Sequence, residues 1–485
     1  MPTENRHPSS CCEVSGRNGG RAGLLPLLER LLCRSGGRKE TADREEVDDT
    51  PSFPALPEGI GREHGGQVTG VRPVVPILLI LATACGTGSD SGEEYEAIHP
   101  NEQDRLSAAT DVPVVHVSFS PGTADLPPEL APLATFDESA AIGLPEALDG
   151  ETSDPVFGTL IDAEVGEDGS IALLDADRSI VRILDPALEP FRVLGGEGAG
   201  PGGLSGARKV FWRGPDELAV YGSGRIDAFR IEDGASRSLG RTPIPSVDFQ
   251  SDACALEDRL YVLGLRFEED QGEDPGSADS AESPDPDVSG VHPELIHELG
   301  AAGQAVRSFS VPYRAAIPVP GHQRRLLSII ATGALECAPG YVWAGYSILG
   351  EIHAHRDDGE LAWVARIDDF DRPGFLFEWD ASGRATGIDF EPGAFDAGHY
   401  EESLDRISLL STDVLAVQVT RTERGTDQEG YPETQTYRTY LLDPRDGRLL
   451  GGFGGDHRIL GGRNGIAILY REVPFPQIAV VRLQN

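Results

Sequence analysis

Five acidic residues recur at comparable positions of a repeated segment, where they could hold a metal ion. Carboxylate oxygens are preferred ligands of Ca²⁺ and other hard divalent cations. A cation held in this way could activate water for a hydrolytic reaction. A structural interpretation stands beside this one, because acids near turns commonly satisfy backbone N–H groups. The five residues are Asp162, Asp248, Asp252, Glu336 and Asp405.

Two cysteines and two histidines offer further chemistry. Cys254 and Cys337 each stand in a Cys-Ala step just before an apolar run, which predicts equivalent positions in successive repeats. In an oxidising compartment they could form a disulfide, and two separate buried thiols are the alternative. His353 and His355 lie on the same side of a strand, because side chains alternate with period two. They could chelate a metal, although a histidine pair on an exposed outer strand is the commoner arrangement.

The elements that would position these residues are six recurring apolar runs, each preceded by a turn. Weak self-similarity at a spacing of about 40–50 residues is typical of a β-propeller. The sequence therefore predicts an all-β fold, a six-bladed β-propeller of four-stranded antiparallel blades. The runs are Ile171–Asp175, Leu218–Tyr221, Leu260–Gly264, Tyr341–Gly345, Val414–Gln418 and Ile466–Tyr470.

The blades can be bounded from the turns between these runs. In the first blade we predict an innermost strand in Phe157–Val165 and an outermost strand at Phe191–Leu194. The final blade is short of strands, so a strand from residues 112–143 is expected to complete it and close the ring, which hides the edges of an open sheet. Val112–Phe119 alternates like a strand in its second half, and Leu133–Phe136 is a second candidate strand in that stretch. The later blades are expected at 207–243, 247–313, 326–368, 400–453 and 457–485.

A glycine-rich stretch follows the first blade, at residues 195–203. It lacks the Gly-Lys-Ser/Thr ending of a phosphate-binding loop, which favours a crossing between blades. Residues 157–235 resemble the first blade of the NHL-like six-bladed propellers found in bacterial surface lipoproteins. Similar six-bladed lactonases and arylesterases hold a divalent cation with Glu, Asn and Asp at the central channel. That resemblance implies a candidate metal site here, but this chain has few asparagines.

A secretion signal is expected inside the chain. Residues 71–85 comprise an arginine, an apolar run, small residues and Cys85, the pattern of a bacterial signal peptide. Residues 82–85, Ala-Thr-Ala-Cys, resemble a lipoprotein signal box, with Cys85 as the lipidated residue. The predicted organisation is a mis-annotated or disordered leader (1–67), a signal peptide (68–85), a flexible tether (86–111) and the propeller (112–485).

The charge of the chain limits its partners. The formal net charge is −39, which repels phosphate backbones and excludes nucleic acid as an expected partner. Residues 267–287 carry a run of acids without a base, which predicts a solvated loop. The run lacks the ligand spacing of a calcium-binding loop, so we expect no cofactor there, with Ca²⁺ or another divalent ion as the alternative.

These observations favour a lipid-anchored propeller of the bacterial cell envelope, exported and monomeric, on the periplasmic or the surface side. Its expected role is binding or scaffolding, with a protein, peptide or glycan as ligand. The alternative is an enzyme, a metal-dependent lactonase or esterase that works through carboxylates of the channel. Carboxylates that converge on one point would favour the enzyme, and carboxylates that pair with arginines would favour the binding module.

Overall fold

The computed structural model divides the chain into two compact units, Met1–Thr69 and Gly70–Asn485. All residues described below belong to the second unit. The expected leader, signal peptide and tether, with Cys85, lie outside the described residues. The structure describes residues 107–483 apart from 109, 120–125, 144–155, 199, 201, 223, 233–234, 267–293, 314–331, 371–374, 380–384, 391–399 and 424–433.

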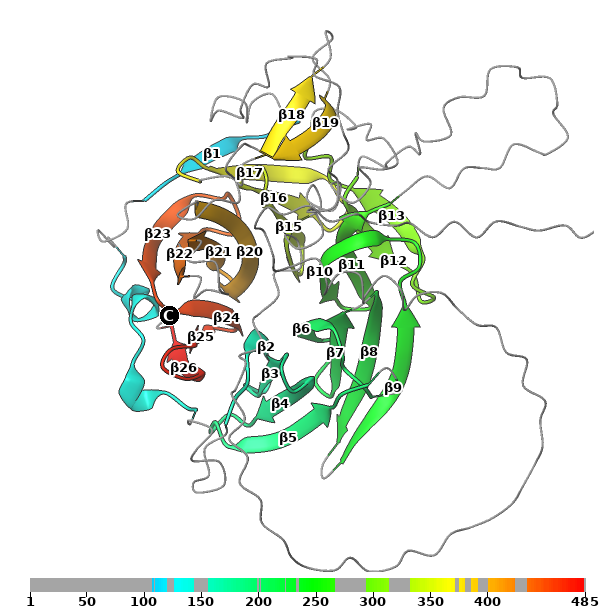
Figure 1. Cartoon of the computed structure of the whole chain (residues 1–485), viewed down its shortest axis with the longest axis vertical. Helices are drawn as coiled ribbons and strands as arrows, with labels where there is room; N and C mark the ends of the chain where they lie inside the picture. Colours follow the sequence, from blue (N-terminus) through cyan, green and yellow to red (C-terminus); the bar gives the residue numbers. More distant parts are fainter. Residues whose placement is uncertain are drawn as a thin grey trace, which may run out of the picture. The chain divides into compact units, whose positions relative to one another are not determined.

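The second unit is a six-bladed β-propeller, as the sequence predicts (Figure 1). Each of the first three blades is a four-stranded antiparallel sheet whose strands follow one another in sequence. Blade one holds β2 (Leu160–Val165), β3 (Ile171–Asp175), β4 (Ile180–Leu184) and β5 (Pro190–Gly195). Blade two holds β6 (Ala207–Trp212), β7 (Glu217–Gly222), β8 (Arg225–Glu232) and β9 (Ala235–Pro243). Blade three holds β10 (Asp248–Leu256), β11 (Arg259–Leu265), β12 (Ile296–Leu299) and β13 (Ala305–Phe309).

The later blades show additions to this plan. Blade four holds β14 (Gly333–Ala338), β15 (Tyr341–Tyr346), β16 (Glu351–Arg356) and β17 (Leu361–Ile367), with β1 (Val114–Val117) outside them. A two-stranded hairpin, β18 (Phe375–Trp379) and β19 (Ala385–Phe390), follows it in sequence. Blade five holds β20 (Tyr400–Ser411), β21 (Val414–Glu423), β22 (Thr434–Leu442) and β23 (Leu449–Gly455). Blade six holds β24 (Arg458–Arg463), β25 (Ile466–Arg471) and β26 (Gln477–Arg482).

The six apolar runs each become the second strand of a blade. Such a strand is covered by a neighbouring blade on both faces, so it reads as a continuous apolar run rather than an alternating one. All five residues of β3 are buried. Side chains of adjacent blades form shared cores, such as the one in which Leu174 of blade one packs with Val220 of blade two. The stacking of blades therefore supplies the hydrophobic core.

The innermost strands contact one another in the order β2, β6, β10, β14, β20 and β24, and β24 returns to β2. This contact closes the ring between blades six and one. Gly461 of β24 lies against the backbone of Ala163, so closely that a Cβ atom would collide with the Ala163 carbonyl oxygen. A side chain at this position would force the first and last blades apart.

The N-terminal segment contacts two different blades, and blade six keeps three strands. Ile142 forms an antiparallel bridge with Ile478 of blade six, the contact expected of a closing strand. β1 instead pairs in parallel with β17 of blade four. The expected strand at Leu133–Phe136 is wrong, because Ala131–Ala134 forms a 3₁₀ turn with a proline in its first positions. Leu133 is buried there, in a core shared with blades five and six.

The two ends of the ring differ in their connections. In an antiparallel blade the turns after the first and third strands lie at one end, here called the tight-turn end. The connections after the second strand and between blades lie at the other, the long-connection end. Among the described strands of the blades, the widest separations in sequence follow a second or a fourth strand, at 196–206, 266–295, 310–332 and 368–399, the last of which includes β18 and β19. The predicted acidic loop is part of one of these and lies outside the described residues.

Candidate functional site

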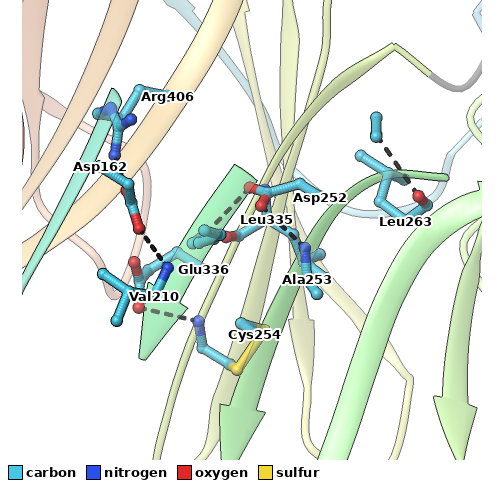
Figure 2. A network of polar contacts seen from close by, with 12 residues as sticks. Asp162, Val210, Asp252, Ala253, Cys254, Leu263, Leu335, Glu336 and Arg406 are labelled. Carbon is cyan, nitrogen blue, oxygen red and sulfur yellow. Dashed lines mark hydrogen bonds and ion pairs between the residues drawn. A yellow bond between two sulfur atoms is a disulfide. The ribbon is translucent and has the colours of Figure 1, made fainter. Parts of the chain in front are cut away.

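Seven charged residues of the innermost strands surround the ring axis, and we call them the axial cluster. They come from all six blades, so the propeller brings together residues that are far apart in sequence. Figure 2 shows part of the cluster, with Asp162 next to Arg406 and Asp252 next to the backbone of Leu335. The seven residues are Asp162, Glu164, Lys209, Asp252, Glu336, Arg406 and Arg463.

Four of these side chains follow a β-bulge, a shift in the pairing between the first and second strands of the blade. The pairing of the innermost strand with the second strand shifts immediately before Asp162, Lys209, Asp252 and Arg406. A β-bulge inserts an extra residue and changes where the following side chain points. Blades one, two, three and five therefore place a charged residue at the axis by the same local device.

Asp162 joins three blades. Its carboxylate accepts the N–H of Val210 on blade two at 2.7 Å and pairs with the guanidinium of Arg406 on blade five. Arg406 also donates to the carbonyl oxygens of Ile161 and Leu460. Asp162 is buried, and burial raises the pKa of its carboxyl although Arg406 opposes the shift. The carboxylate is thus fully engaged by protein groups.

Lys209 makes a similar link among blades two, three and four. Its Nζ donates to Asp252 Oδ2 at 2.9 Å and to the carbonyl oxygen of Leu335. The same Asp252 oxygen accepts the N–H of Leu335 at 2.7 Å. Burial favours the neutral amine, but Asp252, Glu336 and Asp162 together raise the pKa of Lys209. The ammonium therefore stays charged.

Arg463 of blade six reaches two further blades. Its guanidinium lies 3.2 Å from Glu164 Oε1 on blade one and donates to the Cys337 carbonyl oxygen on blade four at 3.3 Å. Glu336, also on blade four, accepts the N–H of Cys337 at 3.2 Å. Burial, together with the charge of Glu336, raises the pKa of Glu164 to about 8 in spite of Arg463. Burial raises the pKa of Glu336 as well, against Lys209 and Arg463.

A disulfide joins Cys254 and Cys337, with a Cα–Cα distance of 5.9 Å. It links β10 to β14, the innermost strands of blades three and four. Glu336 precedes one of the two cysteines, so the covalent link lies next to the axial cluster. The disulfide therefore holds in place the two strands that carry Asp252 and Glu336.

Two of the five predicted acids make no ion pair with this cluster, although the charge of Asp405 acts on its neighbour Arg406. Asp248 is exposed at the start of β10. Asp405 is on β20 and accepts a hydrogen bond from Thr420 Oγ1 of its own blade at 2.6 Å. Among the described residues, no group of three or more His, Cys, Asp or Glu side chains could hold a metal ion. The arrangement does not fit the divalent cation that the resemblance to lactonases implies.

The two histidines of the His-Ala-His step are buried, so the expectation of an exposed strand is wrong. They lie on β16, where His355 is covered by Phe309 and Ser310 at the end of blade three and His353 packs against Tyr346. His353 Nε2 is 3.1 Å from Glu351 Oε2. Glu351 Oε1 also accepts Ser107 Oγ at 2.7 Å and Arg366 Nε at 2.8 Å. Although burial disfavours the Glu351 carboxylate, the hydrogen bond from His353 and its other partners lower its pKa.

A chain of hydrogen bonds continues from His355. Its Nδ1 donates to the Gly359 carbonyl oxygen at 3.2 Å, since a carbonyl can only accept. Nε2 of the neutral ring must then accept from Ser310 Oγ at 2.8 Å, and Ser310 in turn accepts from Tyr346 at 2.6 Å. Burial and the nearby His353 lower the pKa of His355 to about 3. We call Ser310, Tyr346, Glu351, His353 and His355 the blade-four cluster.

Sequence reasoning missed the cationic half of the axial cluster and Glu164. Lys209 carried a usable signal, because it is one of only two lysines in a chain whose other bases are arginines. Arg406 and Arg463 carried none, since the chain has many arginines and only the bulges and the ring show which of them reach the axis.

No helix among the described residues is long and apolar enough to cross a membrane.

Comparisons with known proteins return structural neighbours only. No family model and no curated protein matches the chain. A member of the DUF4221 family from Bacteroides vulgatus has 8% identity and a TM-score of 0.41, covering 70% of this chain and 96% of its own. A Bacteroides fragilis protein described as exported has 10% identity and a TM-score of 0.42, and the match covers 77% of this chain and 100% of that protein. Virginiamycin B lyase from Staphylococcus aureus has 10% identity and a TM-score of 0.32, and the match covers 67% of this chain and 95% of that protein. At such low similarity, no function is inferred from these neighbours.

Proposed function

We propose that this protein is an exported, envelope-tethered β-propeller that serves as a binding or scaffolding module. Its ligand would be a protein, a peptide or a glycan, and its tether a lipid on Cys85, as in the NHL-like lipoproteins that the first blade resembles. The observation that supports this role is the pairing in the axial cluster. Asp162, Asp252 and Glu164 are each paired with a lysine or an arginine.

This pairing makes the axis a rigid connection between blades. Lys209 links blades two, three and four, and Arg406 links blades five, six and one. Buried charges that are paired and hydrogen-bonded fix the geometry around them, because each partner is costly to separate. A rigid ring is a suitable support for variable connections at one end. We therefore place the ligand at the long-connection end.

An exposed aromatic side chain marks a place to test at that end. Phe249 follows Asp248 in the irregular start of β10, where its φ is +44° and its exposed fraction is 36%. A bulky residue at positive φ is strained, and such strain persists only where the surrounding structure imposes it. Apolar, exposed side chains beside a polar rim are common anchors of bound ligands.

The test of this role begins with metal analysis of the purified full chain and a thermal-shift screen of divalent ions. We expect no stoichiometric metal and no shift in melting temperature. One tightly held ion per chain, with ester or lactone hydrolysis that a chelator abolishes, would overturn the binding role in favour of the hydrolase.

Glycan and peptide arrays probed with the same full chain then identify a ligand, and calorimetry measures its Kd. The Phe249→Ala variant is expected to raise Kd about tenfold or more, as loss of a buried anchor does. Val306→Ala is the matched control, because Val306 is 57% exposed on the outermost strand of blade three. Equal Kd values for the two variants would contradict the placement at the long-connection end.

The tether has its own test. Cells that express the full chain are fed an alkyne-tagged fatty acid, and the protein is examined for label and for its partition between membrane and soluble fractions. We expect label on the wild type and none on Cys85→Ala, with the variant released from membranes. Label that persists in Cys85→Ala would contradict lipidation at this residue.

A further inference from the structure

The axial cluster contains one carboxyl group more than it has cations. The four acids Asp162, Glu164, Asp252 and Glu336 face the three bases Lys209, Arg406 and Arg463. Each base is paired with one acid. Within the described part of the chain, Glu336 accepts only the N–H of Cys337. The axis therefore carries a surplus negative charge in a partly buried setting.

Glu336 and Glu164 lie on opposite sides of the ring. Blades one and four are three positions apart in the six-blade order β2, β6, β10, β14, β20, β24. Both acids are near the ends of their strands at the tight-turn end, and Arg463 contacts the residues of both blades. One guanidinium is thus shared between the two sides, and a bound proton is the simplest way to balance the second carboxylate.

We propose that Glu164 and Glu336 share one proton and so make the closure of the propeller ring sensitive to pH. With the proton bound, Arg463 pairs with Glu164 and the uncharged Glu336 remains on blade four. When the proton leaves, two carboxylates face each other across the axis with one guanidinium between them. Like charges in a setting with little water repel strongly, so blades one and four are pushed apart.

Other charged groups also face Glu164 and Glu336. From the other innermost strands, Lys209 attracts both acids, Asp252 repels Glu336, and Asp162 on β2 itself repels Glu164; both aspartates are themselves paired. From the turn after β2, Glu167 acts on Arg463. Burial raises the pKa of both Glu164 and Glu336 despite these cations. The surroundings therefore favour retention of one proton at neutral pH.

The direction of the pH effect follows from this shift. A carboxyl whose pKa is higher in the folded than in the unfolded chain contributes stability below its unfolded pKa of about 4.3, and that contribution is lost as the pH rises through the folded value. For Glu164 the folded value is about 8. The ring should thus weaken between mildly acidic and alkaline pH.

The experiment compares melting temperatures of the full chain with its Glu336→Gln variant above about pH 6.5, where ordinary histidines are at most half protonated and titrate equally in both proteins. The wild type should lose about 2–4 °C more than Glu336→Gln as the pH rises through about 9. Asp248→Asn is the matched control, since it removes an exposed acid of an innermost strand and should retain the wild-type slope. A Glu336→Gln variant with the wild-type slope would overturn the proposal.

A second measurement serves if the variant does not fold. Infrared spectra of the wild type with ¹³C-labelled glutamate should show the band of a protonated carboxyl group at neutral pH. This band should disappear as the pH rises, with the same midpoint pH as the change in melting temperature. A spectrum in which all glutamates are ionised at neutral pH would overturn the proposal. Neither measurement depends on the ligand or on the lipid tether.

Discussion

The axial cluster and the blade-four cluster are two buried polar regions with opposite designs. The axial cluster consists of charged groups, and its links run between blades, from residues such as Asp162 to Arg406. The blade-four cluster lies largely within one blade and its neighbour, and it combines neutral hydrogen bonds, as between His355 and Ser310, with the Glu351 carboxylate, which pairs with Arg366 of the same blade. Ion pairs at the axis thus join different blades, whereas the ion pair of the blade-four cluster stays within one sheet.

The difference also reverses the response to pH. In the axial cluster the pKa of an acid is raised, so stability falls as the pH rises. In the blade-four cluster the pKa of a histidine is lowered, so stability falls as the pH drops. Burial causes both shifts, because it disfavours the charged form of either group. The folded ring should therefore be most stable at pH values between the range in which His355 gains a proton and the range in which Glu164 loses one.

The largest effect is expected from breaking the inter-blade pair at the axis. Arg406→Met leaves Asp162 buried without its cation, which should lower the free energy of unfolding by about 3–5 kcal/mol. Urea titration of the full chain measures it. Arg445→Met is the control, because Arg445 forms a comparable pair with Asp443 while its side chain is 63% exposed. That control should cost less than about 1 kcal/mol. Similar losses for the two variants would show that burial does not distinguish the axial pair.

A second effect should appear in acid and come from the blade-four cluster. The unfolded chain binds a proton on His355 below about pH 6.5, whereas the folded chain does not until about pH 3. Stability is therefore complete above the unfolded pKa and is lost as the pH falls, by on the order of 3 kcal/mol between about pH 6.5 and 4.5.

The His355→Gln variant, which cannot titrate, should lose less stability than the wild type between about pH 6.5 and 4.5. This range lies above the window in which Glu351, whose pKa is lowered, begins to contribute. Chemical unfolding at several pH values measures the difference. Parallel curves for variant and wild type would contradict the assignment of a buried neutral imidazole.

The smallest effect is expected at the contact between the N-terminal segment and blade four. Ser107→Ala removes one hydrogen bond to Glu351, which keeps Arg366 and His353 as partners. The loss should be about 1 kcal/mol. It should be local, with faster hydrogen exchange at Ala108, whose N–H donates to the Pro312 carbonyl oxygen. Faster exchange throughout the ring would instead show that this contact is part of the global closure.

The blades were predictable from the sequence, whereas the path of the N-terminal segment and the site were predictable only in part. Runs such as Ile171–Asp175 and Ile466–Tyr470 predicted the second strands because a strand buried on both faces is apolar throughout. Of the predicted acids, Asp162, Asp252 and Glu336 meet at the axis, whereas Asp248 is exposed. Periodicity gives the strand to which a residue belongs, but a bulge decides where its side chain points. Sequence alone shows no bulge.

The sequence by itself determined the architecture, because the repeat of apolar runs and turns encodes how each blade is covered by the next. Only the tertiary structure decided the chemistry of the axis. The partners of Asp162 and Glu164 are Arg406 and Arg463, which lie several blades away along the chain. Ion pairing depends on distance in space, and closure of the ring sets that distance. The same closure leaves Glu336 as the acid of the axial cluster that takes part in none of the three ion pairs made by the cations of that cluster.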